Sequence, residues 1–116
     1  MLVLRKEVYY VNLGGGTLGS EVQKTRPCII VSNDTGNKFS NTVIVCPIST
    51  KDGKILPTHS KLSSNSFVKG VILSEHVRSV DKSRLGTKIG RISDREMEEV
   101  EKTLLISLGI KNIHKN

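Results

Sequence analysis

The last quarter of the chain has the apolar periodicity of an amphipathic helix, and the rest of the fold must cover the apolar face of that helix. Apolar residues recur there at the spacing of one helix face, at Met97, Val100, Leu104 and Leu108. Ser93 followed by Glu96 forms a capping-box pattern, and Gly109 supplies a stop signal after the repeat. We predict an amphipathic helix of about four turns. Such a helix needs a surface on which to bury its apolar face, and a sheet is the expected surface.

The preceding residues consist of short runs of β-formers separated by glycine-rich or polar stretches. The predicted strands are 8–13, 28–31, 42–46, 71–73, 77–80 and 88–92. Residues 56–73 resemble a long hairpin with its tip near 63–65, and residues 81–85 resemble one helical turn. Short strands followed by one helix predict a mainly β (α+β) fold of the small-barrel type. We expect a single domain over residues 1–110 and a polar C-terminal tail over 111–116.

The positive charge belongs to the body of this domain. The chain has a formal net charge of +7 over 116 residues. Residues 1–92 contain 14 Lys and Arg against 6 Asp and Glu, a net of +8, whereas residues 93–116 contain 4 against 5, a net of −1. A polyanion or an acidic partner suits such a surface, and a basic surface kept for solubility is the alternative.

The cysteine and histidine pattern argues against a disulfide or a metal site. Cys28 and Cys46 both lie inside apolar runs, which favours buried free thiols. Two cysteines and three scattered histidines lack metal-ligand spacing, so we expect no metal and no other cofactor. No apolar run approaches the roughly 20 residues that span a bilayer, and the N-terminus does not resemble a signal peptide. These features predict a cytoplasmic protein with no membrane span.

Several strings, in order and over nearly the whole chain, resemble the MazF/PemK toxins. The strings are 5–13, 19–21, Arg26-Pro27, 31–34, 36–37, 56–59, 71–73, 77–82, 84–85 and 106–108. The resemblance implies the SH3-like β-barrel with a C-terminal helix that MazF, Kid and CcdB-type toxins share, and it implies a homodimer. It also implies a type II toxin that cleaves single-stranded RNA (mRNA) at a short motif by 2′-hydroxyl attack without a metal. The implied partner is a cognate MazE-like antitoxin.

The resemblance places the chemistry on Arg26 and Ser49. Arg26 matches the family's catalytic arginine, and its planar guanidinium is suited to two phosphate oxygens at once. An arginine keeps its proton, so charge stabilisation suits Arg26 better than a role as general base. Ser49 stands at the end of the strand 43–48, where relatives usually carry a catalytic threonine, and Thr50 is the alternative if the strand bulges there.

The same resemblance implies a set of substrate-binding residues. They are Ser20, Glu21, Leu56, Pro57, His59, Glu75 and Arg78. A structural role for His59, and a structural ion pair of Glu75 with Arg78, are the alternatives. The loop after Glu21 departs from the family pattern, so the cleavage motif is not predictable from it.

Two other functions remain open at this point. One is a CcdB-type gyrase poison, which shares the fold but binds protein. The other is a catalytically inactive RNA-binding module of the same barrel, which the serine at position 49 keeps open. The Arg26-Pro27 string and the string 56–59 favour the endoribonuclease.

Overall fold

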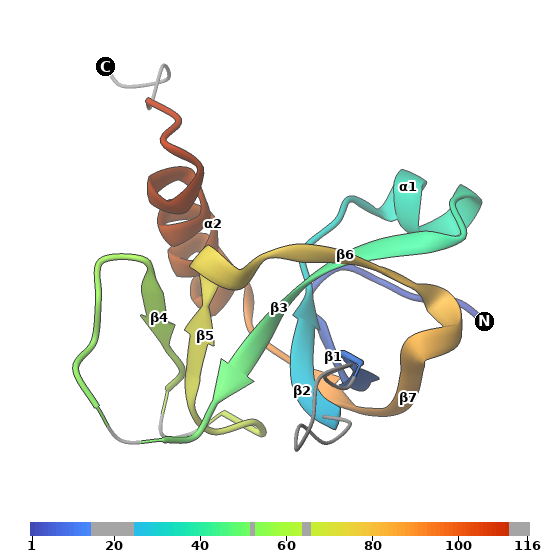
Figure 1. The fold of residues 1–116 in the computed structure, drawn as a ribbon, viewed down its shortest axis with the longest axis horizontal. Helices are drawn as coiled ribbons and strands as arrows, with labels where there is room; N and C mark the ends of the chain where they lie inside the picture. The colour runs from blue at the N-terminus through green and yellow to red at the C-terminus, as the bar shows by residue number, and fades with distance from the viewer. Residues whose placement is uncertain (15–24, 52, 64–65, 112–116) are drawn as a thin grey trace, which may run out of the picture.

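The computed structural model describes residues 1–14, 25–51, 53–63 and 66–111 (Figure 1). The strands are β1 (Glu7–Asn12), β2 (Thr25–Ile30), β3 (Thr42–Ser49), β4 (His59–Lys61), β5 (Val71–Leu73), β6 (Arg78–Asp81) and β7 (Leu85–Arg91). The α-helices are α1 (Asp34–Phe39) and α2 (Asp94–Leu108), and the 3₁₀ turns are η1 (Ser74–His76) and η2 (Lys82–Arg84). No helix in these described ranges is long and apolar enough to cross a membrane.

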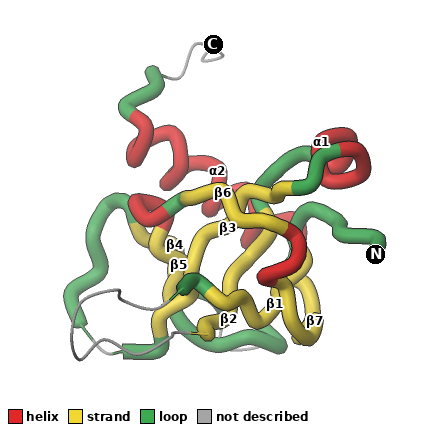
Figure 2. The backbone as a smooth tube through the Cα atoms, turned by 45° about the vertical axis from the view of Figure 1, so that its right-hand side comes forward, coloured by secondary structure: helices red, strands yellow, loops and turns green. Residues whose placement is uncertain are grey.

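All strand pairings are antiparallel, and the longest strand, β3, organises them. The sheet runs in the order β4-β5-β3-β2-β1-β7. One edge of β3 pairs with β2, and the other is divided between β6 and β5. Within the described residues β4 and β7 do not pair with each other, so the sheet is an open, barrel-like one. Figure 2 shows the strands curling, with α2 outside them.

The two faces of the sheet bury separate cores, because successive side chains of a strand point to opposite faces. The inner core contains Val3, Tyr9, Val11, Cys28, Ile30, Val43, Val45, Val80 and Leu85. The outer core contains Val8, Ile29, Cys46, Ile48, Leu62, Val68, Ile72, Ile92, Met97 and Val100. The last two residues belong to α2, so α2 covers the outer face of the sheet.

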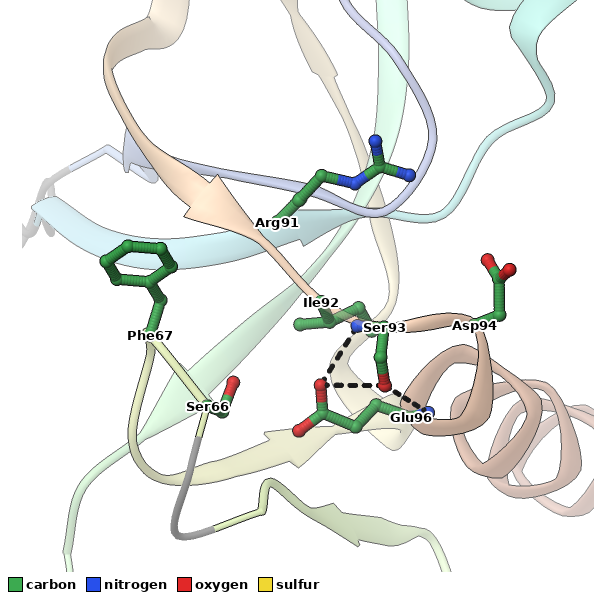
Figure 3. A pocket seen from close by; sticks show the side chains of 7 residues that line it. All are labelled: Ser66, Phe67, Arg91, Ile92, Ser93, Asp94 and Glu96. Atoms are coloured by element: carbon green, nitrogen blue, oxygen red, sulfur yellow. Dashed lines mark hydrogen bonds between the residues drawn. The ribbon is translucent and has the colours of Figure 1, made fainter.

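The capping box predicted at the start of α2 is present (Figure 3). The Ser93 hydroxyl accepts the Glu96 N–H, and the Glu96 carboxylate accepts the Ser93 N–H at 3.0 Å. Gly109 ends the helix in the left-handed conformation at φ 70°. These contacts satisfy backbone groups that a helix end otherwise leaves unpaired. The mainly β fold with a C-terminal amphipathic helix is thus confirmed.

A small buried hydroxyl cluster joins α2 to the sheet. The Thr103 hydroxyl lies 3.1 Å from the Ser60 hydroxyl of β4 and 2.7 Å from the Ser74 hydroxyl of η1. It also donates to the carbonyl of Val100. All three hydroxyls are buried and hydrogen-bonded, so this polar contact fixes η1 and β4 against α2.

The structure differs from the sequence-based expectation in several elements. Strands β2 and β7 each begin three residues earlier than predicted, at Thr25 and Leu85, so Arg26 lies inside β2 and not before it. Helix α1 lies within the polar stretch 32–41, for which we predicted no helix or strand, and the Asn33 side chain caps it by accepting the Gly36 N–H. A six-residue polar helix is too short to show an apolar repeat. Strand β3 runs three residues beyond Cys46, to Ser49. The tip of the 56–73 hairpin at 64–65 and the tail at 112–116 lie outside the described residues.

Both cysteines are free and buried, as predicted. Burial raises the pKa of each thiol to about 12. Both are therefore protonated near neutral pH and act as small apolar side chains.

A buried carboxylate, Glu7, ties the N-terminal segment to β1 and β7. It accepts hydrogen bonds from the Leu4 N–H at 2.8 Å, the Tyr9 hydroxyl at 3.0 Å and the Lys88 ammonium at 2.9 Å. Burial alone would raise the pKa of Glu7, but these hydrogen bonds outweigh it and lower the pKa below 4.5. Ionised Glu7 therefore stabilises the fold above its unfolded pKa, and this contribution is lost as the pH falls through the folded pKa.

We expect Glu7→Gln to lower the free energy of unfolding by about 1–3 kcal/mol at pH 7, because a charge-assisted network is broken. The difference from wild type should shrink as the pH falls from 4.5, the ordinary pKa of a glutamate, through the lower folded pKa of Glu7. Urea unfolding of both proteins from pH 7 to pH 3 measures this. A difference that stays constant down to pH 3 would contradict the assigned pKa direction.

Gly70 sets how closely the β4–β5 hairpin approaches the end of β3. It has a φ of +127°, and a Cβ there would lie 2.5 Å from the Ser49 carbonyl oxygen. We expect Gly70→Ala to destabilise the fold by about 1–3 kcal/mol through backbone strain and this clash. Gly53→Ala is the control, because a Cβ there meets nothing within 4 Å. Equal thermal unfolding midpoints for the two variants would show that the close approach is not required.

Candidate functional site

The pairing of β2 with β3 brings Arg26 and Ser49 together. Cys28 pairs with Pro47 in this antiparallel ladder, and the same register continued by two residues sets Arg26 opposite Ser49. By strand alternation both side chains share the face that carries Cys28 and Val45. They therefore lie just beyond the end of the inner core, and both are half-buried.

Arg26 lies between two grooves. The first groove, of about 460 Å³, is lined by Thr25, Arg26, Pro27, Ile48, Ser49, Thr50 and Lys51. The second groove, of about 330 Å³, is lined by Leu13, Arg26, Pro47, Leu73, His76 and Arg78. The guanidinium thus has access to an anion in either groove, and Ser49 shares the first one with it.

The Ser49 hydroxyl is partly oriented by its neighbour. Its oxygen accepts the Lys51 N–H at 3.2 Å, which leaves the hydroxyl hydrogen available to donate to a ligand. Thr50 is exposed and lines the same first groove, so geometry leaves the choice between the two hydroxyls open.

His59 is held in a turn by hydrogen bonds on both ring nitrogens. Its Nδ1 accepts the Leu56 N–H at 3.1 Å, so the ring hydrogen lies on Nε2, which donates to Glu75 at 2.9 Å. Glu75 also accepts from the Thr58 hydroxyl at 2.9 Å. Burial would raise the pKa of Glu75, but the hydrogen bonds from His59, its own N–H and Thr58 lower it. Glu75 is therefore ionised near neutral pH and pairs with His59.

The string 56–59 forms the turn that this pair stabilises. The His59 N–H donates to the Leu56 carbonyl at 2.9 Å, and Leu56 and Pro57 are exposed on the turn. Neither residue lines the two grooves described above. His59 lines a third groove of about 170 Å³. Its lining residues are Ser49, Lys51, Gly53, Lys54, Ile55, His59, Val71 and Leu73.

Arg78 anchors the end of β1 as well as lining the second groove. Its guanidinium donates to the Leu13 carbonyl at 3.1 Å, and Arg84 donates to the Asn12 carbonyl at the same distance. Both contacts are to neutral carbonyls, so neither cancels the positive charge. Ser20 and Glu21, predicted to bind substrate, lie outside the described residues.

The structure adds basic residues that the sequence did not single out. A fourth groove, of about 280 Å³, continues past Ser49. It is lined by Ser49, Thr50, Lys51, Lys61, Leu62, Ser63, Lys69, Gly70 and Val71. Among the described residues, no carboxylate lines any of the four grooves. His76, which lines the second groove with Arg26, also went unpredicted because only the fold brings it there.

A further hollow at the start of α2 has a different character (Figure 3). It is lined by Ser66, Phe67, Arg91, Ile92, Ser93, Asp94 and Glu96. Its two carboxylates are already engaged, Glu96 in the capping box and Asp94 with Lys6. Nowhere in the described part of the chain do three or more His, Cys, Asp or Glu side chains gather so as to hold a metal ion.

Comparison with known proteins identifies the family. Residues 4–108 match the family described as PemK-like, MazF-like toxin of type II toxin-antitoxin system. The endoribonuclease MazF of Staphylococcus saprophyticus is 40% identical over 116 residues, covering 97% of this chain and 96% of its own length.

Solved structures share the fold. An endoribonuclease in complex with its cognate antitoxin, from a mycobacterial species, superposes with a TM-score of 0.82 at 24% identity, covering 95% of this chain and 98% of its own. The MazE-MazF complex of Deinococcus radiodurans gives 0.81 at 24% identity, with 96% and 99% covered. With a family match over nearly the whole length and a relative at 40% identity, the chain belongs to the PemK-like, MazF-like toxins of type II toxin–antitoxin systems.

Proposed function

We propose that this chain is a toxin that acts as an endoribonuclease, cleaving single-stranded RNA at a short sequence motif without a metal. The observation that carries the proposal is the placement of Arg26 and Ser49 opposite each other, at the edge of grooves whose described lining residues include basic but no acidic side chains. The family membership and the name of the 40% identical relative support the endoribonuclease assignment.

The reaction proceeds by attack of the ribose 2′-oxygen on the adjacent phosphorus. The new bond closes a cyclic phosphate, and the bond from phosphorus to the 5′-oxygen breaks. The 2′-hydroxyl loses a proton to solvent and the departing 5′-oxygen gains one, so no co-reactant is consumed. Charge accumulates on the non-bridging phosphate oxygens, where the Arg26 guanidinium and the Ser49 hydroxyl donate hydrogen bonds.

Substrate binding extends from this pair to the flanking residues. Arg78 and Arg26 border the second groove and provide two guanidinium groups for phosphate. His59 and Glu75 hold the turn that presents Leu56 and Pro57. We assign Ser20 and Glu21 to the same substrate-binding set on the family resemblance alone.

The proposed partners follow from the same surface. Structural neighbours are described as complexes with an antitoxin, and a MazE-like antitoxin with an acidic segment suits a basic groove. We propose a homodimer that acts on mRNA in the cytoplasm.

The first test is cleavage of a long unstructured RNA in excess EDTA, with the product ends mapped. We expect wild type to cut at one short recurring motif, and Arg26→Ala to lose about 100-fold or more in rate because a charged donor to the transition state is removed. Arg95→Ala is the control, since it removes the same charge from the exposed face of α2. Full activity of Arg26→Ala would refute the site, and activity that requires an added divalent cation would refute metal independence.

The hydroxyl assignment is tested with a second pair of variants. We expect Ser49→Ala to slow cleavage by about 10–100-fold, the range of one hydrogen bond to a charged group. Thr50→Val should have little effect in single-turnover assays on the same RNA. A larger loss of cleavage rate in Thr50→Val than in Ser49→Ala would assign the catalytic hydroxyl to Thr50.

A further inference from the structure

We propose that Lys51, Lys61 and Lys69 form a second phosphate-binding subsite, a lysine ledge, that holds the RNA backbone of a nucleotide flanking the cleaved bond. This inference rests on the proposed function. These three lysines line the fourth groove described above. That groove shares Ser49, Thr50 and Lys51 with the first groove.

Strand register sets the ledge in line with the cleavage site. Ser49 of β3 pairs with Val71 of β5, and Val71 pairs with Lys61 of β4. Directly paired residues share one face of a sheet, so Arg26, Ser49, Val71 and Lys61 form one row across four strands. With neighbouring strands about 4.8 Å apart, Lys61 lies about 14 Å from Arg26 along this row.

That separation favours two phosphates over a single shared one. A phosphate held between Arg26 and Ser49 lies at least two strand spacings, about 10 Å, from the backbone of Lys61. The ledge therefore contacts the phosphate of a neighbouring nucleotide, and Lys51, which lines both grooves, lies between the two subsites.

Packing fixes the ledge in place. Gly70 approaches the Ser49 carbonyl too closely for any side chain, and its own carbonyl accepts the Leu62 N–H at 2.9 Å. Lys61 and Lys69 flank these two residues, so the backbone that carries them is held against the end of β3. Leu62 is buried in the outer core, which anchors the hairpin further.

The chemistry of the ledge suits phosphodiesters more than bases. Its charged groups are ammonium groups, which attract phosphate as point charges. None of the described residues that line this groove is aromatic, so they provide no platform for base stacking. The subsite should therefore add affinity for longer RNA with little dependence on its sequence.

The test compares Lys61→Gln/Lys69→Gln with Lys38→Gln/Lys82→Gln. Both double variants lose the same charge, but Lys38 and Lys82 belong to α1 and η2 and line none of the four grooves. Binding is measured by fluorescence anisotropy over a range of salt concentrations. The ligands are fully 2′-O-methylated oligonucleotides, which cannot be cleaved by 2′-oxygen attack, of about five and about fifteen nucleotides.

We expect the ledge variant to lower the slope of log affinity against log salt by about 1.4 for the longer ligand, that is about 0.7 for each lost phosphate contact. The slope for the shorter ligand, and both slopes for the control variant, should stay at the wild-type values. Replacing the flanking nucleotides by abasic ones should leave the wild-type slope unchanged, since the ledge contacts phosphate.

Equal slopes for the two double variants on the longer ligand would overturn the subsite, as would a wild-type affinity that does not increase with length. Cleavage of unmodified RNA by the same preparations separates this outcome from failure of the proposed function. If wild type binds with the expected slopes but cuts no RNA, the endoribonuclease proposal fails, and the ledge is retained only as an RNA-binding subsite.

Discussion

The antiparallel pairing of β2 with β3 is the constraint on which the rest of the structure depends. Its register buries Cys28 and Val45 in the inner core and Ile29 and Cys46 in the outer core. A shift by one residue would exchange the two faces and move each set of side chains into the other core. The same register sets Arg26 opposite Ser49 where the cores end. The residues that stabilise the fold and those that form the candidate site are thus aligned by one ladder.

Positive and negative charges lie on different elements of the molecule. The sheet carries the basic grooves around Arg26 and Ser49, whereas α2 carries Asp94 and four glutamates. Most of the site's neighbours therefore attract phosphate, and the acidic helix lies on the outer face of the sheet, away from the inner face that carries Arg26 and Ser49. Among the described residues, Glu75 is an exception near the third groove, and its carboxylate accepts hydrogen bonds from His59 and Thr58. A polyanion approaching the grooves meets little competing negative charge.

The sequence predicted best the elements that have a repeat or a clear local signal. The apolar stripe and the capping box of Ser93 and Glu96 located α2 to within a residue, because local sequence fixes both features. Helix α1 was missed because it is short and polar, and its cap at Asn33 is a single local contact. The expected position of Ser49 at the end of its strand is confirmed, although Pro47 and Ser49 are poor strand formers by themselves.

The candidate site was predictable only where a family resemblance marked single residues. Arg26 and Ser49 are 23 positions apart in the sequence, and nothing local indicates that they meet. Lys51, Lys61 and Lys69 look like ordinary surface lysines until the pairings of β3, β5 and β4 bring them to one groove. The contacts of His59 with Glu75 likewise arise from the turn and from η1, and no spacing rule encodes them.

The most direct test of the central claim, that Arg26 and Ser49 act on one phosphate, is a double-mutant cycle on the rate of RNA cleavage. It compares wild type, Arg26→Ala, Ser49→Ala and the double variant under single-turnover conditions. If both side chains stabilise the same transition state, the double variant should lose clearly less than the product of the two single losses. Fully multiplicative losses would show that the two residues act independently, and would contradict a shared site.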